Sequence, residues 1–312
     1  MTAPTATDAF ARRSRSGYGR YLAPGIVSFV VVLLVPFIGN IWISLHHWRG
    51  GRSAMRWVGL ENYTTLMHDE RFWTSFLNSV YMIVAMVVIP TLIGLVIAAA
   101  LFDYIGKKFS GRVSSVLRAC YYIPQILPVA VAGILWNWIL SAQGGALNTF
   151  LGSIGVQDPP NWLGDPDFAL YAVMLVLVWA QIGYPVVIFM SALQRVDPEL
   201  YEAAELDGAG WWARFRAITL PQIRPEMFVV VLTCTVAALK VFAPIYVLTK
   251  GGPESSTLVP SYYSYTTFFT KSDVGYGSAI ASVLALVIVV VAGAILALQA
   301  RSDRREREGV HA

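Results

Sequence analysis

The chain has 312 residues, of which 56% are hydrophobic and 13% are charged, and its net charge is +4. A soluble domain carries about 25% charged residues, so this composition excludes an ordinary soluble protein and favours one that crosses a membrane. The Lys and Arg residues lie in short segments between apolar runs rather than in one stripe, which argues against a nucleic-acid-binding protein.

The first 20 residues form a polar, basic segment that contains Arg12, Arg13, Arg15 and Arg20. The apolar run that follows is longer than the core of a signal peptide and lacks a convincing small-residue cleavage site. We therefore expect residues 1–20 to be a cytoplasmic tail and the next run to be a retained membrane span.

Six apolar runs are long enough to cross the hydrocarbon layer, which takes about 20 residues as a helix. They cover residues 21–45, 77–102, 115–140, 168–192, 227–249 and 276–300. All but the last contain proline, which kinks a membrane helix or leaves broken turns beside a cavity. These prolines are Pro24, Pro36, Pro90, Pro124, Pro128, Pro185 and Pro244. Cys120 and Cys234 fall in or beside the spans, so we expect free thiols rather than a disulfide.

The Lys and Arg residues predict the orientation of the spans. With the N-terminus inside, the inner segments 1–20, 103–118, 193–225 and 301–312 hold four each, sixteen in all, whereas the outer segments hold six. An excess of Lys and Arg marks the cytoplasmic side. Both termini are therefore expected in the cytoplasm, as is the segment that joins the fourth and fifth spans.

That inner segment contains a polar stretch, residues 197–221, with the marks of two short helices meeting at a corner. Asp197 can cap a helix that begins at Pro198. Gly208 and Gly210 give the backbone the freedom to bend. We call this stretch the elbow and expect it to contact something outside the membrane.

The second half of the elbow has an apolar stripe at helical spacing. Trp211, Phe215 and Ile218 form the stripe, and we expect Pro221 to end the helix. Across both halves runs a fixed pattern, namely Glu202-Ala203-Ala204, three residues, Gly208, nine residues, Ile218, one residue and Leu220-Pro221.

This pattern resembles the EAA signature of permease subunits in bacterial ABC importers, with every fixed position present. In that family the elbow is a coupling helix that sits in a cleft of a separate ATPase subunit. The resemblance implies coupling to an ATPase through Glu202, Ala203, Ala204, Glu205, Asp207, Gly208, Ile218, Leu220 and Pro221. Glu202 and Glu205 share one helix face and could pair with basic residues of the ATPase, although a solvated surface would look the same.

Shorter stretches along residues 20–300 resemble the sugar-type branch of that family, which includes the maltose transporter's membrane subunits. They are Trp57–Tyr63, Phe72-Trp73 with Asn78, Pro124, Pro128 and Trp136, Gly145–Asn148, Lys240-Val241-Phe242 and Leu248–Pro253. Two positions depart from the branch, because Ala243 stands where an acid is common and Lys250 where glycine is common. The departures bear on the identity of the solute.

An uphill transporter needs a source of energy. The chain has no G-x-x-x-x-G-K-[ST] phosphate loop, so hydrolysis by that route must come from a partner, which would bind the ATP and Mg²⁺. An ion-coupled secondary transporter would be expected to place an acid or His near the bilayer midplane. Asp103, Glu226 and Asp273 instead fall at span ends or in loops, and the four His residues lie outside the spans. This pattern favours ATP coupling over ion coupling.

Sugar sites combine aromatic faces with amide or hydroxyl donors. The candidates in the spans are Asn78, Tyr81, Trp136, Asn137, Trp179, Gln181 and Tyr184, although packing and interface anchoring also account for Trp and Tyr.

Lys240 is the one charge well inside a predicted span, where it costs about 2.5–3.5 kcal/mol on the insertion scale. It could face the solute pathway, pair across a subunit interface, or make a structural bond. His46-His47 is expected to be incidental, and no metal-ligand cluster or nucleophile–base pair is evident.

These observations predict an all-α membrane protein with six transmembrane helices, a type I ABC importer transmembrane domain over residues 21–300, followed by a cytoplasmic tail at 301–312. The resemblance implies a multi-pass permease in the bacterial inner membrane that takes up a sugar or sugar-like solute. It also implies a second permease that completes a heterodimer, two ATP-binding cassette subunits and an extracytoplasmic solute-binding protein, with lipid but no nucleic acid as further partners. No cofactor and no enzymatic activity are expected in this chain. An ion-coupled transporter and a non-transporting membrane assembly subunit are the alternatives.

Overall fold

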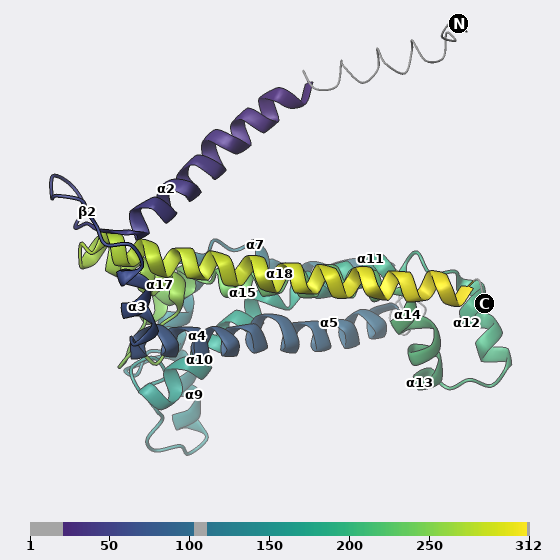
Figure 1. Cartoon of the computed structure of the whole chain (residues 1–312). Coiled ribbons are helices and arrows are strands. Elements are labelled where there is room, and N and C mark those ends of the chain that lie inside the picture. Colours follow the sequence, from purple (N-terminus) through teal and green to yellow (C-terminus); the bar gives the residue numbers. More distant parts are fainter. Residues whose placement is uncertain (1–20, 103–110, 311–312) are drawn as a thin grey trace, which may run out of the picture.

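The computed structural model describes residues 21–102 and 111–310, and within these ranges helices dominate, as predicted (Figure 1). The basic N-terminal tail and Asp103 lie outside the described residues. Both cysteines, Cys120 and Cys234, are free thiols as expected.

Long helices run side by side along the molecule, and short elements gather at its two ends (Figure 1). The first half of the chain contains η1 Val30–Leu34, α2 Val35–Ser44, β1 His46–His47, β2 Arg56–Trp57, α3 Glu61–Met67, α4 Glu70–Ile83, η2 Val84–Val88, α5 Ile89–Ala100, α7 Gly111–Ile126, α8 Val129–Ile139 and α9 Ala146–Ser153. The second half contains α10 Pro166–Gln181, α11 Gly183–Leu193, α12 Pro198–Leu206, α13 Trp211–Arg214, η4 Phe215–Thr219, α14 Leu220–Gln222, α15 Arg224–Leu239, α16 Ala243–Leu248, α17 Pro260–Tyr265, η5 Thr266–Thr270 and α18 Val274–Val310. Elements marked η are π-helical, and β1 and β2 form a small antiparallel pair in which His46 faces Trp57.

The number of membrane spans fits the prediction of six. Among the described residues, four continuous helices are long and apolar enough to cross a membrane, and two helix pairs, bent by 101° and 67°, make six if each pair is one span. The fifth span differs from its predicted limits of 227–249. Its helix α15 continues from the elbow after a bend and ends at Leu239, and α16 is separate.

Most prolines in the spans are accommodated in one of two ways. Pro36, Pro90 and Pro221 each follow a π-helical turn in which the residue before proline donates its N–H to the carbonyl five residues back. Such a turn lets the helix continue although proline lacks an N–H. In contrast, Pro128 and Pro244 lie at true breaks, between α7 and α8 and after α15.

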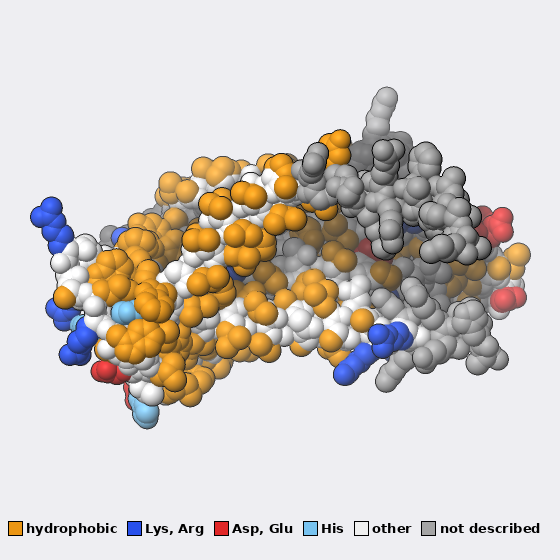
Figure 2. Space-filling model, turned by 45° about the horizontal axis from the view of Figure 1, so that its top comes forward, with side chains coloured by type: hydrophobic (Ala, Val, Ile, Leu, Met, Phe, Trp, Pro, Cys, Tyr) orange, Lys and Arg blue, Asp and Glu red, His pale blue; other side chains and the backbone are white. Residues whose placement is uncertain are grey.

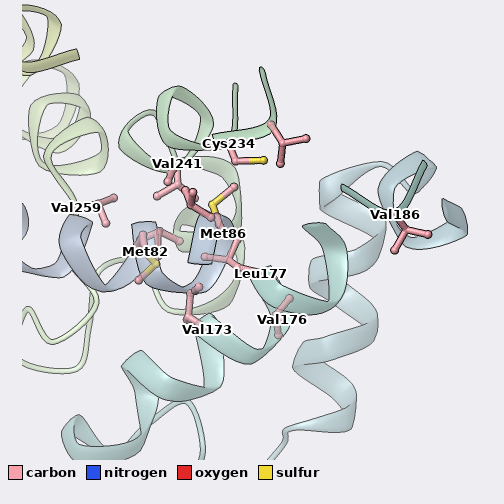
Figure 3. Packing of buried hydrophobic residues seen from close by; sticks show 14 of the residues in the cluster. Met82, Met86, Val173, Val176, Leu177, Val186, Cys234, Val241 and Val259 are labelled. Carbon is pink, nitrogen blue, oxygen red and sulfur yellow. The ribbon is translucent and has the colours of Figure 1, made fainter. Parts of the chain in front are cut away.

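Close packing holds the long helices together. Figure 3 shows buried side chains from α4, η2, α10 and α15 that converge, among them Met82, Met86, Leu177 and Cys234. Helices in lipid pack closely where small residues let their backbones approach. At Gly94 of α5, an added Cβ would lie only 2.7 Å from Cβ of Pro185 in α11.

The two ends of the molecule differ in content. The elbow end holds α12, α13, α14 and the C-terminal end of α18, and the loop end holds the β pair, α3, α9 and α17 (Figure 1). Figure 2 shows apolar side chains covering the middle of one face and charged side chains gathered near the ends. This distribution is what a lipid-facing belt requires.

Amide side chains tie α2 to the loop end. Nδ2 of Asn62 donates to the backbone carbonyls of Ser44 at 2.7 Å and His46 at 3.0 Å. Nδ2 of Asn40 donates to Oγ of Ser282 in α18 at 2.9 Å. The helical stretch before α2 stands away from the other helices (Figure 1), and the most apolar window of Tyr21–Ser44 buries no residue within the chain.

A half-buried carboxylate ties three elements at the loop end. Oδ2 of Asp69, the N-cap of α4, accepts hydrogen bonds from the hydroxyls of Tyr263 at 2.5 Å and Tyr276 at 2.6 Å. Burial alone raises the pKa of Asp69, but these two hydrogen bonds and those from the backbone N–H groups of Arg71 and Phe72 outweigh it, so the pKa lies below its ordinary value. The carboxylate is therefore charged at neutral pH.

Replacing Gly94 by Ala should destabilise the protein by about 1–3 kcal/mol, because the new methyl group would overlap α11. Thermal unfolding in detergent measures the change. Gly293→Ala in α18 is the control, since a Cβ there meets nothing within 4 Å, and it should be neutral or stabilising by up to about 1 kcal/mol. Equal effects of the two substitutions would contradict the packing described.

Tyr276→Phe should lower the free energy of unfolding by about 1.5–3 kcal/mol at neutral pH, because a charged acceptor loses one donor. The stability that depends on ionised Asp69 is present above its unfolded pKa and is lost as pH falls through the lower folded pKa. The difference between the variant and the wild type should therefore shrink in acid. Tyr171→Phe, at an exposed position of α10, is the control and should show no such pH dependence in thermal unfolding.

Candidate functional site

The first helix of the elbow begins and ends as its sequence predicts. Oδ1 of Asp197 accepts the N–H of Glu199 at 3.0 Å and so caps α12. At the other end Gly208 has a φ of +76°, and the N–H groups of Gly208 and Ala209 donate to the carbonyls of Glu205 and Ala204. This arrangement is a Schellman motif, which needs a left-handed residue at the position of Gly208.

The second half of the elbow packs back onto the membrane helices. Phe215 and Ile223 are buried, and the hydroxyl of Tyr201 in α12 lies 3.0 Å from Oγ1 of Thr219. The helical run does not end at Pro221, as the sequence suggested, but reaches Gln222 because a π turn precedes the proline. The two halves of the elbow are thus tied to each other, and buried side chains hold the second half against the helices.

The outer face of the elbow combines apolar and acidic side chains. Leu206 is 90% exposed, and Trp211 and Trp212 are 43% and 56% exposed. Glu202 is exposed beside them. Oε2 of Glu205 accepts a hydrogen bond from Arg214 at 2.9 Å, so this carboxylate has a partner within the elbow.

The other residues of the fixed pattern flank this face. Ala203, Asp207 and Pro221 are exposed, and Ala204, Ile218 and Leu220 are partly buried. The small side chains at 203 and 204 leave the surface of α12 low enough for a partner to approach closely.

Helix α15 connects the elbow to the middle of the molecule. It begins at Arg224, directly after the buried Ile223, and runs without a break to Leu239. Its first turn is tied by an ion pair between Glu226 and Arg195, which follows α11. One unbroken helix thus joins the base of the elbow to the middle of the molecule.

At that far end lies a cavity of about 400 Å³ between the two helix breaks. One wall is the break around Leu127, and another is the break from Lys240 to Phe242. This volume lies within the range of ligand pockets, roughly 300–1,000 Å³. We call it the central cavity.

Apolar side chains and backbone form most of the lining of the central cavity. Among the described residues, three polar side chains also line it, namely Gln125, Gln181 and Lys240. Nε2 of Gln181 donates to Sγ of Cys234 at 3.1 Å, which fixes its orientation. The start of α8 also lies here at Val129, with no side-chain cap. Uncapped N–H groups of a first turn are donors for a bound oxygen atom.

The structure places two of the predicted pathway residues, Gln181 and Lys240, on the central cavity. Lys240 is exposed at the C-cap of α15 rather than in the interior of a continuous helix. Asn78 is buried, and Nδ2 donates to the carbonyls of Ser255 and Leu258, which gives it a structural role.

The five remaining candidates do not line this cavity. Trp136 and Trp179 contact each other edge to face, with ring centroids 5.4 Å apart. Tyr81 and Asn137 are exposed, and Tyr184 packs against the core. The sequence analysis did not name Gln125 as a pathway candidate. Its position between Pro124 and Pro128, two prolines of one span, indicated a polar residue near a helix break.

The remaining predictions concern His and metal sites. His46 is buried against the rings of Trp42 and Trp57, with both centroids 5.0 Å away, so its role is packing. Glu226 and Asp273 lie at helix starts, as expected. Within residues 21–102 and 111–310, no group of three His, Cys, Asp or Glu side chains could hold a metal ion.

Known proteins with this arrangement are membrane transport subunits. The trehalose/maltose transport system permease protein MalF of Thermococcus litoralis is 34% identical over 278 residues, which cover 89% of this chain and 91% of that protein. A bacterial ABC transporter involved in the import of alginate has the same fold, with a TM-score of 0.80, 22% identity, and coverage of 95% of this chain and 99% of the other. The alginate transporter in complex with its pentasaccharide-bound periplasmic protein gives a TM-score of 0.75 at 24% identity, with coverage of 90% and 93%.

Residues 91–308 match the family described as the binding-protein-dependent transport system inner membrane component. The match covers more than half of the chain and includes the elbow and all residues that line the central cavity except Met86. The chain therefore belongs to this family of inner-membrane transport components.

Proposed function

We propose that this chain is one permease half of an ATP-driven importer for a sugar or sugar-like solute. The observation that carries the proposal is the continuous connection from an exposed elbow, through the single helix α15, to a cavity at two helix breaks. A partner that moves the elbow can thereby change the shape of the cavity, as in other rigid-body switches.

The exposed face of the elbow supports an ATPase as that partner. Leu206, Trp211 and Trp212 present apolar surface that favours burial in a cleft, and Glu202 adds a charge that suits basic residues. ATP and Mg²⁺ would bind in the ATPase, and this chain would transmit its motion without being an enzyme. The elbow is then cytoplasmic, as are both termini, in agreement with the excess of Lys and Arg.

The first span, Tyr21–Ser44, supports a second membrane subunit. Its most apolar window buries no residue within the chain, so lipid or another subunit must cover these side chains. We propose a heterodimer with a second permease, served by two ATPase subunits and an extracytoplasmic solute-binding protein. The named relative for trehalose and maltose, and the alginate transporter with its periplasmic protein, support this assembly.

The central cavity suits a hydroxylated solute. Gln125 and Gln181 offer amide groups, Lys240 offers an ammonium group, and the start of α8 offers backbone N–H donors. Uptake of a panel of sugars by proteoliposomes that hold the complete transporter, with ATP inside and solute-binding protein outside, tests the proposal. Uptake that persists without the ATPase and collapses with a protonophore would contradict it.

Gly208→Val should abolish most solute-stimulated ATP hydrolysis and uptake while leaving insertion into the membrane intact. A β-branched residue at φ +76° strains the Schellman turn by about 1–2 kcal/mol, which changes the angle between the halves of the elbow. Gly208→Asn is the matched control, because Asn tolerates this backbone region and no atom lies within 4 Å of an added Cβ. Equal activity of Val and Asn variants would rule out a role for the turn geometry.

Lys240→Met should raise the KM for uptake about 10- to 100-fold, because a hydrogen bond from a charged group contributes about 1.5–3 kcal/mol. Lys250→Met is the control, since Lys250 lies at the loop end away from the central cavity. Both variants should assemble normally, as judged by size-exclusion chromatography of the complex. Unchanged assembly and uptake for Lys240→Met would remove this residue from the pathway.

A further inference from the structure

A second and larger cavity lies at the loop end, about 560 Å³ in volume. Its walls come from α3, the start of α4, η5 and the start of α18, together with His47 of β1. We call it the loop-end pocket. Its position opposite the elbow places it on the extracytoplasmic side under the proposed function.

The charges of the loop-end pocket are predominantly acidic. Glu61, Asp69 and Asp273 line it, whereas Lys271 is the one Lys or Arg among the described residues of its walls. The ammonium group of Lys271 lies over the ring of Tyr263, 5.0 Å from its centroid. Three carboxylates against one ammonium group favour a cationic occupant.

The three carboxylates are not equally engaged. Both oxygens of Asp69 accept hydrogen bonds, from Arg71 N–H and from two Tyr hydroxyls. Oδ1 of Asp273 accepts the N–H of Tyr276 at 3.2 Å. Glu61 is exposed at the rim and has no side-chain hydrogen bond to the described residues. Asp69 therefore contributes fixed negative charge, while Glu61 and Asp273 retain oxygen atoms for a ligand.

An unsatisfied hydroxyl group also faces this pocket. Thr267 of η5 lines it, is only 1% exposed, and its Oγ1 has no hydrogen-bond partner among the described residues. Buried hydroxyl groups almost always have a partner. An N–H donor that enters the pocket would supply the missing hydrogen-bond partner of Thr267 Oγ1.

A bound divalent cation does not fit, because no three acidic or His side chains among the described residues converge as metal ligands. A long basic side chain fits better, since its apolar stem can enter a cleft while its N–H groups reach separated oxygens. We propose that the loop-end pocket receives a Lys or Arg side chain from the extracytoplasmic solute-binding protein. This inference rests on the proposed function.

The test measures the affinity of the complete transporter in nanodiscs for the solute-binding protein that stimulates its ATPase activity. The double variant Glu61→Gln/Asp273→Asn removes two charges and keeps the side-chain shapes. It should weaken binding at least about tenfold, with a smaller loss at high salt. The matched control is Asp158→Asn/Asp167→Asn, two exposed acids outside the pocket around the start of α10, and its affinity should be unchanged.

Thr267→Val gives a readout that folding alone would not produce. The substitution removes an unsatisfied buried hydroxyl group, so thermal unfolding of the free transporter should be unchanged or slightly higher. Binding should nevertheless weaken several-fold. Unchanged affinity in this variant would overturn the assignment of Thr267 to the contact.

The possible failures are distinguishable. Equal weakening by the pocket and control double variants would show only long-range charge and overturn the inference, as would no weakening by either. In both cases normal stimulation of the wild-type transporter would leave the proposed function standing. If the wild-type complex responds to no solute-binding protein, the proposed function fails and the inference fails with it.

Discussion

The structure depends on the requirement that backbone N–H and C=O groups in a membrane find partners. Lipid supplies none, so a helix can break inside the bilayer only where protein or water covers the open ends. In the described part of the chain, the breaks around Leu127 and from Lys240 to Phe242 both border the central cavity. The cavity is therefore the place where irregular backbone is permitted.

The same requirement explains why the remaining prolines do not interrupt their helices. The π turns before Pro36 and Pro90 reassign the hydrogen bonds of the residues in front of them. These helices remain rigid, and α15, which has Pro225 only in its first turn, is unbroken over its whole length. Unbroken helices lie between the elbow and the helix breaks at the central cavity. A deformation is therefore expected at the breaks rather than within these helices. That is the mechanical property that coupling between two distant sites needs.

Much of this arrangement could be predicted from the sequence, because lipid imposes strong local rules. Apolar runs gave the number of spans, and Asp197, Pro198 and Gly208 gave the limits of α12. The tertiary partners could not be predicted, because they join residues far apart in the chain. Asn78 looks like a sugar ligand, but its amide binds the carbonyl of Leu258. No single span shows that Gln125 and Lys240 share one cavity.

The boundaries of the fifth span show the same limit. The run of apolar residues continues through 227–249, so the sequence predicted that Lys240 is a charge inside a membrane helix. The backbone instead breaks after Leu239, and the charge faces a cavity. Conversely, Lys250 departs from a glycine that is common in the sugar branch, and its φ of +52° supplies the physical reason for glycine there. A departure from a sequence pattern can thus mark a residue whose backbone is strained.

The two cavities differ in a way that bears on selectivity. The central cavity has three polar side chains in a mainly apolar lining, so it can accept hydroxyl groups but has few fixed directions with which to distinguish one sugar from another. The loop-end pocket is lined by three carboxylates, of which Asp69 is held in place by hydrogen bonds from two tyrosine hydroxyl groups. Fixed charges distinguish protein partners well, since mismatched pairs are costly. Under the proposed function, discrimination would then rest on which solute-binding protein docks, and the pathway itself could remain permissive.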